Sequence, residues 1–276
     1  MVTFVKAHAY GNDFLYVKAG DVGGIALDAL ARQICDRHSG VGADGLIVYE
    51  SADPVSPVIN DVSMRLFNAD GSRAEVSGNG VRALGALILD ESPAPYAELV
   101  VRTEGGVKHL VRTSRDGTHQ TFRAAMGQPT DLTERSIVVS GEPITVAVLN
   151  MGNPQAVILG PLPDQSRFQT LGAALERHEA FPAGTNVEFA QVEAPDRVRI
   201  LIWERGVGPT TSSGTGSCAA LVAAASFGGA SRSAEVVAPG GAQRVEWLPD
   251  GVYLTGWAEV LCRGEWSRPL PARTDG

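Results

Sequence analysis

Short runs of β-branched and aromatic residues recur along most of the chain, and glycine-containing turns separate them. Such runs are typical of strands, and the clearest are LIVYE (46–50), AELVVRT (97–103), ITVAVLN (144–150), NVEFAQV (186–192) and RVRILIW (197–203). Apolar residues at helical spacing predict helices in four other segments, 25–40, 78–90, 169–181 and 214–227. Strand-rich halves that each contain a strongly apolar helix predict an α+β fold in which strands wrap around a buried helix.

Two of the predicted helices begin with the same short pattern. Residues 77–84 read SGNGVRAL, and residues 213–220 read SGTGSCAA, 136 positions further along. Two other landmarks precede each pattern in the same order and at nearly the same spacing. The three matched pairs are Asn12 and Asn153, Asn68 and Glu204, and Ser77 and Ser213. Landmarks that recur in order indicate two copies of one structural unit, so we expect two pseudo-symmetric domains.

The repeated Ser-Gly-x-Gly pattern has a direct physical interpretation. The first turn of a helix leaves backbone N–H groups unpaired and carries partial positive charge, so it favours an anion. Glycine allows a ligand to approach that backbone closely. Two such turns that face one another would bind a small molecule with a carboxylate. The alternative is that Ser77 and Ser213 only cap their helices, which serine does well.

Composition and charge narrow the class of protein. The 276 residues are 44% hydrophobic and 20% charged, which describes a globular protein of one large domain or two smaller ones. The net charge of −8, without a run of Lys or Arg, argues against nucleic acid or an anionic membrane as a partner. No apolar stretch approaches the ~20 residues of a membrane span. Cys35, Cys218 and Cys262 match no metal site, and the N-terminus lacks a signal-peptide pattern, so we expect a cytoplasmic protein.

Six stretches spread over nearly the whole chain carry a resemblance to a known family. They are GNDF (11–14), GVGADGL (40–46), FNADGSRAEVSGNGVRAL (67–84), NMGNPQAV (150–157), GTNVEF (184–189) and ERGVGPTTSSGTGSCAA (204–220). In these motifs the chain resembles diaminopimelate epimerase, a family that interconverts LL- and meso-diaminopimelate without a cofactor. The resemblance implies an isomerase of lysine biosynthesis that acts on a small amino acid and that often forms a homodimer.

The resemblance also implies a domain organisation. Residues 1–124, completed by residues 263–276, would form one domain, and residues 125–262 would form the other. Each domain would consist of strands around a central helix, with the active site in the cleft between the two. The family's chemistry requires two acid/base groups on opposite faces of one carbon, because one removes the α-proton as the other delivers a proton from behind.

The same resemblance implies the roles of individual residues. In the family both acid/base groups are cysteines that immediately precede a Gly-x-Gly, and the matching positions here are Ser77 and Ser213. The implied substrate-binding residues are Asn12, Asn68, Gly78, Asn79, Asn153, Asn186, Glu204, Arg205, Gly214 and Thr215. Arg205 suits a carboxylate because a planar guanidinium binds both oxygens. For the asparagines the alternative is turn formation. No metal or other cofactor is expected.

The two serines depart from the family's pattern and change the chemistry that is available. A thiol titrates near 8.5, and a helix N-terminus lowers this value, whereas a serine hydroxyl is, like water, a far weaker acid. The difference of roughly seven units corresponds to about 10 kcal/mol, of which a helix dipole returns only ~0.3 to 2 kcal/mol. The chain also departs at Gln155, where the family usually has histidine, and at Pro209, where it usually has glutamate.

Three hypotheses therefore stay open at the level of sequence. The first is an epimerase whose activity is weakened or altered by the serines. The second is a non-catalytic homologue that binds an amino acid. The third is an isomerase of the same fold that uses a carboxylate as its base, for which Asp70, Glu75, Asp13 and Asp44 are candidates. His8 also lies near a motif, but a structural role is commoner for such a histidine.

Overall fold

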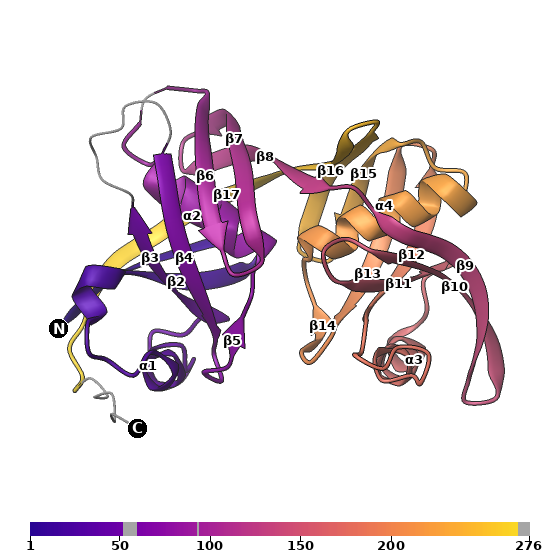
Figure 1. Cartoon of the computed structure of the whole chain (residues 1–276), viewed down its shortest axis with the longest axis horizontal. Helices are drawn as coiled ribbons and strands as arrows, with labels where there is room; N and C mark the ends of the chain where they lie inside the picture. The colour runs from indigo at the N-terminus through magenta and orange to yellow at the C-terminus, as the bar shows by residue number, and fades with distance from the viewer. Residues whose placement is uncertain (52–59, 93, 270–276) are drawn as a thin grey trace. The chain divides into compact units, whose positions relative to one another are not determined.

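The computed structural model describes residues 1–51, 60–92 and 94–269, and the chain divides into two compact units (Figure 1). The first unit consists of two segments, Met1–Ala124 and the segment that begins at Trp257. The second unit consists of Ala125–Gly256. The part of the expected first domain at residues 270–276 lies outside the described residues.

The first unit is a ring of paired strands. Its strands are β1 (Val2–Ala9), β2 (Asn12–Lys18), β3 (Gly45–Ser51), β4 (Asn60–Asn68), β5 (Arg73–Ala74), β6 (Ala97–Thr103), β7 (Gly106–Asp116) and β8 (His119–Gly127). The pairs β2–β3 and β4–β6 are parallel, and the others along the ring are antiparallel. The long strand β17 (Gly251–Trp266) pairs with both β1 and β8, which closes the ring.

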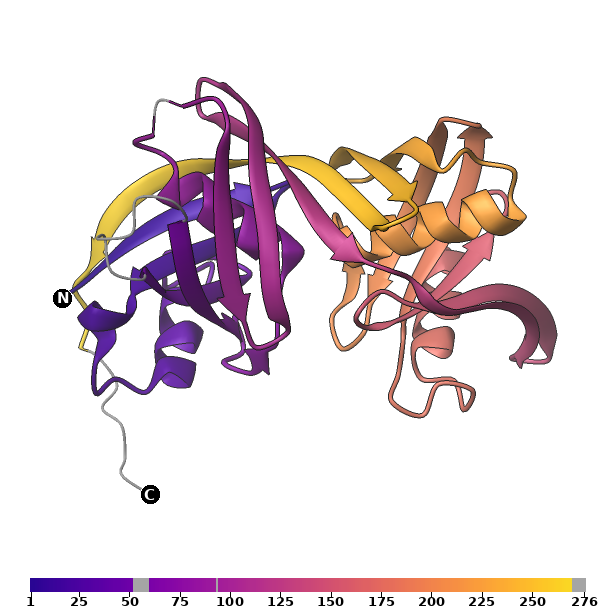
Figure 2. The same ribbon diagram turned by 45° about the horizontal axis from the view of Figure 1, so that its top comes forward.

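One helix occupies the centre of this ring. The helical segments of the unit are η1 (Ala19–Val22), α1 (Leu27–Ile34) and α2 (Gly78–Ile88). Strands surround α2 (Figure 2), which packs against β1, β2 and β7. Close packing explains its glycines, since a Cβ on Gly85 would lie 3.2 Å from the ring of Phe122.

The second unit repeats this arrangement. Its strands are β9 (Thr130–Val139), β10 (Glu142–Asn150), β11 (Pro154–Leu159), β12 (Asn186–Ala194), β13 (Arg197–Glu204), β14 (Gly208–Thr210), β15 (Ser233–Ala238) and β16 (Gly241–Leu248), followed by the first part of β17. Its helices are α3 (Gln165–Glu176) and α4 (Gly214–Phe227). The parallel pairs β11–β12 and β13–β15 occupy the same places in the order as β2–β3 and β4–β6.

The central helices also begin in equivalent places. The helix α2 follows the short strand β5, which pairs with β4, and α4 follows β14, which pairs with β13. Small residues allow α4 to be enclosed on all sides, and every residue from Cys218 to Ala224 is fully buried. The predicted α+β fold, with strands around a central helix in each repeat, is therefore confirmed.

Three predicted helices have different bounds in the structure. The smallest difference is at α2, which was predicted at 78–90 and ends at Ile88. The segment predicted at 169–181 forms α3, which begins earlier because Asp164 caps it and accepts a hydrogen bond from the Arg167 amide at 2.8 Å. It ends at Glu176, so residues 177–181 are not helical. The segment predicted at 25–40 is helical only from Leu27 to Ile34, because Asp36 accepts hydrogen bonds from the amides that follow it and forms a turn.

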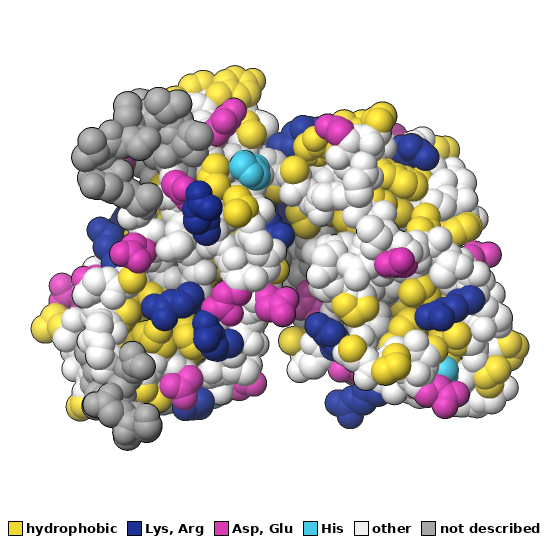
Figure 3. Space-filling model, in the orientation of Figure 1, with side chains coloured by type: hydrophobic (Ala, Val, Ile, Leu, Met, Phe, Trp, Pro, Cys, Tyr) yellow, Lys and Arg dark blue, Asp and Glu magenta, His cyan; other side chains and the backbone are white. Residues whose placement is uncertain are grey.

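The surface is mixed in character. Figure 3 shows acidic and basic side chains interspersed with apolar ones on one face of each unit. Within the part of the chain that the structure describes, no helix has both the length and the apolar character to cross a membrane.

Candidate active site

Ser77 and Ser213 are the N-cap residues of α2 and α4, and their local geometry is closely similar. Each has an extended backbone, with φ −125° and ψ 122° at Ser77 and φ −138° and ψ 127° at Ser213. The Oγ of Ser77 accepts a hydrogen bond from the Gly80 amide at 3.1 Å, and that of Ser213 accepts one from the Gly216 amide at 3.2 Å. The capping role is thus present at both positions, and each serine lies where the N–H groups of a helix are exposed at its first turn.

The second glycine of each Ser-Gly-x-Gly pattern is required by packing inside its own unit. A Cβ on Gly80 would lie 2.8 Å from the Cδ1 of Ile47 on β3. A Cβ on Gly216 would lie 2.5 Å from the Oε1 of Glu188 on β12. The sequence predicts that glycines here allow a ligand to approach, and the structure shows that close contact between the helix start and a strand also requires the second glycine.

A chain of hydrogen bonds in the first unit joins two of the predicted site residues. The Nδ2 of Asn79 donates to the Oδ1 of Asn12 at 3.2 Å, and the Nδ2 of Asn12 donates to Asp44 at 2.7 Å. The buried Arg82 donates to the Oδ1 of Asn79 at 2.6 Å and lies 5.4 Å from the centre of the Tyr10 ring. Asp44 and Arg82 thereby fix which way the two asparagine amides point. Asp44 and Arg82 lie in motifs quoted above, but the sequence did not reveal that they orient the asparagines.

An ion-pair network holds the loop that carries Asn12. Arg37 donates to Asp13 at 2.7 Å and to Asp44 at 2.8 Å, and Lys6 is paired with Asp13 at 2.9 Å. Burial opposes the charged form of Asp13, but Arg37 and Lys6 outweigh it and lower the pKa of this carboxyl group below its usual value of 3.8. Asp13 is therefore a weak base with a structural role.

Asn68 and Asp70 form a turn at the end of β4. The Nδ2 of Asn68 donates to the Oγ of Ser72 at 2.9 Å, and Asp70 accepts bonds from the amide and the hydroxyl of the same serine at 2.8 and 2.6 Å. The side chain of Ser72 lowers the pKa of Asp70, with a further contribution from its amide. Both residues therefore take part in the turn, and the contacts of Asp70 do not favour its use as a base.

His8 is part of a satisfied aromatic and carboxylate cluster. Its Nδ1 accepts a hydrogen bond from the Gly11 amide at 3.1 Å, so its Nε2 carries the proton that is donated to Glu259 at 2.9 Å. Its ring meets the Trp257 ring edge-on, with the centroids 5.3 Å apart. His8 therefore supports the turn before Asn12 and has the structural role that is common for such a histidine.

In the second unit, Asn153 and Thr215 are brought together at the first turn of α4. The Nδ2 of Asn153 donates to the Oγ1 of Thr215 at 3.3 Å, and the amide of Gln155 lies 2.6 Å from the Oδ1 of Asn153. Gln155 and the neighbouring Glu188 are both fully buried, whereas Asn153 and Thr215 are half-buried. Sequence reasoning did not identify Glu188, although it lies in the motif GTNVEF.

Asn186 and Arg205, two further predicted site residues, are also in contact. The Arg205 amide donates to the Oδ1 of Asn186 at 2.9 Å, and the guanidinium of Arg205 donates to the Ala183 carbonyl at 3.0 Å. Among the residues that the structure describes, no acidic side chain within the same unit forms a salt bridge with Arg205, which is exposed. The half-buried Glu204 precedes it at the end of β13.

Glu176 holds the turn that carries Arg205, a role that the sequence did not reveal. It accepts hydrogen bonds from the Trp203 indole and from the Gly206 amide, both at 2.8 Å. Burial opposes its charged form, but these two donors outweigh burial and lower the pKa of Glu176 below 4.5. A buried carboxylate that accepts two N–H bonds is a firm anchor for a loop.

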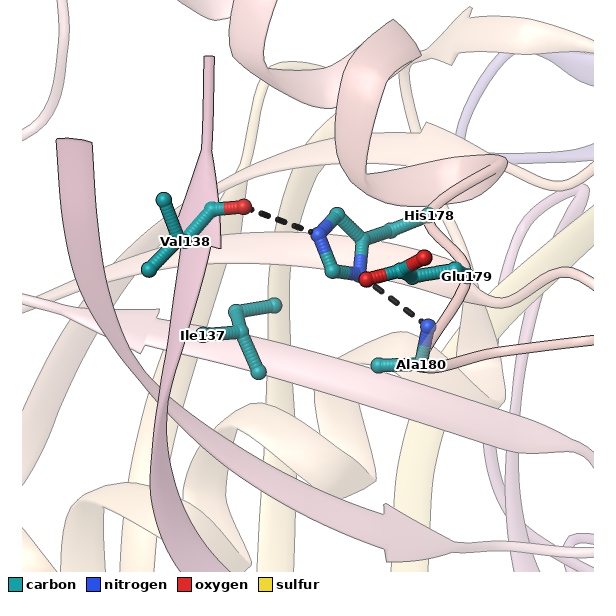
Figure 4. A pocket seen from close by; sticks show the side chains of 5 residues that line it. All are labelled: Ile137, Val138, His178, Glu179 and Ala180. Atoms are coloured by element: carbon teal, nitrogen blue, oxygen red, sulfur yellow. Dashed lines mark hydrogen bonds between the residues drawn. The ribbon is translucent and has the colours of Figure 1, made fainter. Parts of the chain in front are cut away.

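A surface hollow elsewhere in the second unit does not contain the predicted site residues (Figure 4). It is lined by Ile137, Val138, His178, Glu179 and Ala180. The Nε2 of His178 donates to the Val138 carbonyl at 3.0 Å, and its Nδ1 accepts from the Ala180 amide at 3.1 Å. Both ring nitrogens are engaged in structural bonds, so this histidine is not available as a base.

Comparison with solved structures identifies proteins of similar fold. The fold is similar to that of a hydroxyproline epimerase from Agrobacterium vitis, whose structure holds trans-4-hydroxy-L-proline. The TM-score is 0.70 at 17% identity, and the match covers 95% of this chain and 91% of that one. At this identity the likeness establishes the fold alone.

Sequence comparison then establishes the family. A diaminopimelate epimerase of Desulforudis audaxviator is 39% identical, over 96% of this chain and 99% of that protein. One from Pelotomaculum thermopropionicum is 38% identical, over 95% of this chain and 98% of that protein. The family model of diaminopimelate epimerase matches residues 4–131 and 147–261. The chain belongs to the diaminopimelate epimerase family, which is a family of isomerases.

Proposed function

We propose that the chain is a cofactor-independent amino-acid epimerase that interconverts LL- and meso-diaminopimelate, with Ser77 and Ser213 at the positions of the acid/base pair. The observation that carries this proposal is the matched geometry of the two serines. Each caps a central helix, has nearly the same backbone angles and accepts a bond from the amide three residues later. Two equivalent positions suit a reaction in which one group removes the α-proton and the other returns a proton to the opposite face.

The surrounding residues would hold the substrate. Backbone N–H groups of Gly78 and Asn79, and those of Gly214 and Thr215, suit the α-carboxylate because they belong to helix first turns. Arg205 would bind the remote carboxylate. The asparagines and Glu204 supply amide oxygens and a carboxylate for the two amines, and the full set consists of Asn12, Asn68, Asn79, Asn153, Asn186 and Glu204.

The serines would make this epimerase slow. A hydroxyl is a far weaker acid than a thiol, so a serine loses its proton much less readily than a cysteine. The free-energy barrier to removal of the α-proton is therefore higher with serine as the base. Serine is activated in enzymes by a base such as histidine or lysine. Within its own unit, and among the described residues, neither Ser77 nor Ser213 accepts a bond from or donates one to such a side chain. This observation favours a second candidate function, a homologue that binds the amino acid without turnover.

The proposed function also implies a pathway, a cellular compartment and a class of partner. A role in lysine biosynthesis would place the protein in the cytoplasm, with a small amino acid rather than nucleic acid or a membrane as its partner. The three cysteines all lie in the described part of the chain and form no disulfide, which is consistent with a reducing compartment. The homodimer implied by the family resemblance can be checked by sedimentation.

Exchange of the α-proton tests the proposed function. The protein would be incubated with LL-diaminopimelate in deuterated water, and loss of the α-proton signal would be followed by proton NMR while chiral chromatography followed the meso product. We expect slow, saturable exchange. Micromolar binding in calorimetry without exchange would support the binding homologue instead, and the absence of both binding and exchange would overturn both candidates.

A further inference from the structure

Glu188 is a fully buried carboxyl group behind the first turn of α4. It lies on β12, and its Oε1 occupies the space next to Gly216 that a Cβ would need. Its hydrogen-bonding neighbour is the equally buried amide of Gln155. A carboxyl group that faces a neutral amide is satisfied in two ways, because it can donate to the amide oxygen as an acid or accept from the amide nitrogen as an anion.

The neutral acid gives one direction to the hydrogen bonds that follow. The oxygen of the Gln155 amide lies 3.0 and 3.1 Å from the two oxygens of Glu188, and oxygens in such contact need a proton between them. The Gln155 nitrogen then donates to the Oδ1 of Asn153 at 2.6 Å, and the Asn153 nitrogen donates to the Oγ1 of Thr215 at 3.3 Å. Because Thr215 accepts in this chain, its own O–H is available to a ligand.

The carboxylate reverses that direction. With Glu188 charged, the Gln155 nitrogen turns toward both carboxylate oxygens at 3.0 and 3.1 Å. The Gln155 oxygen then accepts from the Thr215 hydroxyl at 3.2 Å. The Gln155 oxygen also lies 2.6 Å from the position of the Asn153 Oδ1. Two oxygens cannot share a hydrogen bond without a proton, so the Asn153 amide must turn and present its nitrogen to Gln155. In this state the Thr215 hydroxyl donates its hydrogen bond to Gln155 and cannot donate one to a ligand.

The surroundings of Glu188 favour the neutral acid. Burial raises the pKa of Glu188 well above 4.5, and the nearby carboxylate of Glu204 on β13 raises it further. The first turn of α4, with its partial positive charge, acts in the opposite direction. The hydrogen-bond chain therefore runs from Glu188, which is fully buried, to Thr215, which is half-buried.

We propose that Glu188 is a positioning residue, whose carboxyl O–H donates a hydrogen bond to the amide oxygen of Gln155. This bond sets the direction of the hydrogen-bond chain and leaves the Thr215 hydroxyl free to donate to an anionic ligand. The inference rests on the proposed function only in naming that ligand, the carboxylate of an amino acid at the first turn of α4. The direction of the chain itself is a property of the protein without ligand.

Carbon-13 NMR of the protein labelled at its glutamate side-chain carboxyl groups tests whether Glu188 carries the proton on which this direction depends. We expect one carboxyl resonance that titrates at clearly higher pH than the other glutamates and that is missing from the Glu188→Gln variant. If that variant does not fold, Gln155→Leu should move the same resonance to a different titration midpoint. A wild-type spectrum in which every glutamate titrates in the ordinary range would overturn the proposal.

Binding of LL-diaminopimelate by calorimetry tests the consequence for the ligand. We expect the affinity of the wild type to fall at least about threefold as the pH rises through the titration of that resonance. Glu188→Gln should bind within about threefold of the wild type at pH 7 but lose this pH dependence, because its amide donates to Gln155 at every pH. Gln155→Leu interrupts the chain and should weaken binding about three- to tenfold.

Two results would overturn the proposal in this second experiment. One is the same pH dependence in Glu188→Gln as in the wild type, and the other is unchanged binding in Gln155→Leu. A wild type that does not bind LL-diaminopimelate at all would count against the proposed function, whereas the NMR titration would still decide whether Glu188 is the neutral acid that the proposed direction requires.

Discussion

The hydroxyl oxygen of Ser213 lies 3.2 Å from the amide nitrogen of Gly216 and accepts its hydrogen bond. The bond satisfies one of the N–H groups that the first turn of α4 leaves unpaired. Ser77 and Gly80 form the same bond at 3.1 Å at the start of α2. A side chain in either position is therefore held at a helix start by the fold itself, whether it is an acid/base group or only a cap.

Removal of a cap should lower stability by a measurable amount. We expect Ser213→Ala to reduce the free energy of unfolding by about 1 kcal/mol, within a range of roughly 0.5 to 2 kcal/mol, because the Gly216 amide loses its acceptor. Urea denaturation measures the change. Ser136→Ala, at an exposed position on β9, is the matched control and should change stability by less than about 0.5 kcal/mol. Equal stability of the two variants would show that the cap contributes nothing.

Restoring thiols at both helix starts should raise the rate of α-proton exchange. The double variant Ser77→Cys with Ser213→Cys is expected to exchange the α-proton of LL-diaminopimelate at least about 100-fold faster than the wild type, since a thiolate is accessible at neutral pH. Proton NMR in deuterated water measures the rate. Each single variant leaves a hydroxyl on one face and should gain less than the double variant. A double variant that binds the ligand but exchanges no faster than the wild type would rule out these positions as the acid/base pair.

The contact between α4 and β12 should make Gly216 intolerant of a side chain. A Cβ there would lie 2.5 Å from the Oε1 of Glu188, which is fully buried and has little room to move. We expect Gly216→Ala to cost about 1 to 3 kcal/mol of unfolding free energy. Gly20→Ala is the control, because nothing lies within 4 Å of a Cβ at that exposed position. Similar melting temperatures for the two variants would contradict the packing that we describe.

The anchor of the Arg205 turn should be sensitive to both mutation and acid. Glu176→Gln retains one acceptor for two N–H donors, so we expect a loss of about 1 to 3 kcal/mol and a higher KM for diaminopimelate through displacement of Arg205. Because folding lowers the pKa of Glu176, its contribution is fully present above pH 4.5 and is lost as the pH falls through the lower value of the folded protein. Denaturation curves between pH 3 and 7 should therefore converge for wild type and variant at the acidic end. A constant difference over this range would show that Glu176 does not act as a carboxylate.

The main features of the fold could be predicted from sequence because they depend on local patterns. Short runs of β-branched and aromatic residues between glycine turns marked the strands, and the recurrence of Ser-Gly-x-Gly marked the two central helices and the repeat. The end of α3 could not be predicted, because Ala180 and Phe181 reach the apolar core of the second unit through a turn rather than through a further turn of helix.

The supporting residues of the candidate site could not be predicted for a different reason. Glu176 and Gly206 lie 30 positions apart, and Gln155 and Glu188 meet only because β11 and β12 are parallel neighbours. No local periodicity encodes such contacts. The motif GTNVEF drew attention to Asn186, whereas the burial of Glu188 two residues later depends on which face of β12 meets α4.

One measurement tests most directly whether both helix starts bind the same ligand. LL-diaminopimelate would be titrated into nitrogen-15-labelled protein while the backbone amide resonances of Gly78, Asn79, Gly214 and Thr215 are followed. We expect all four resonances to shift with a single dissociation constant, while the amide of Gly20 stays unchanged. Shifts confined to one helix start, or two different dissociation constants, would contradict the proposal that Ser77 and Ser213 act on one molecule.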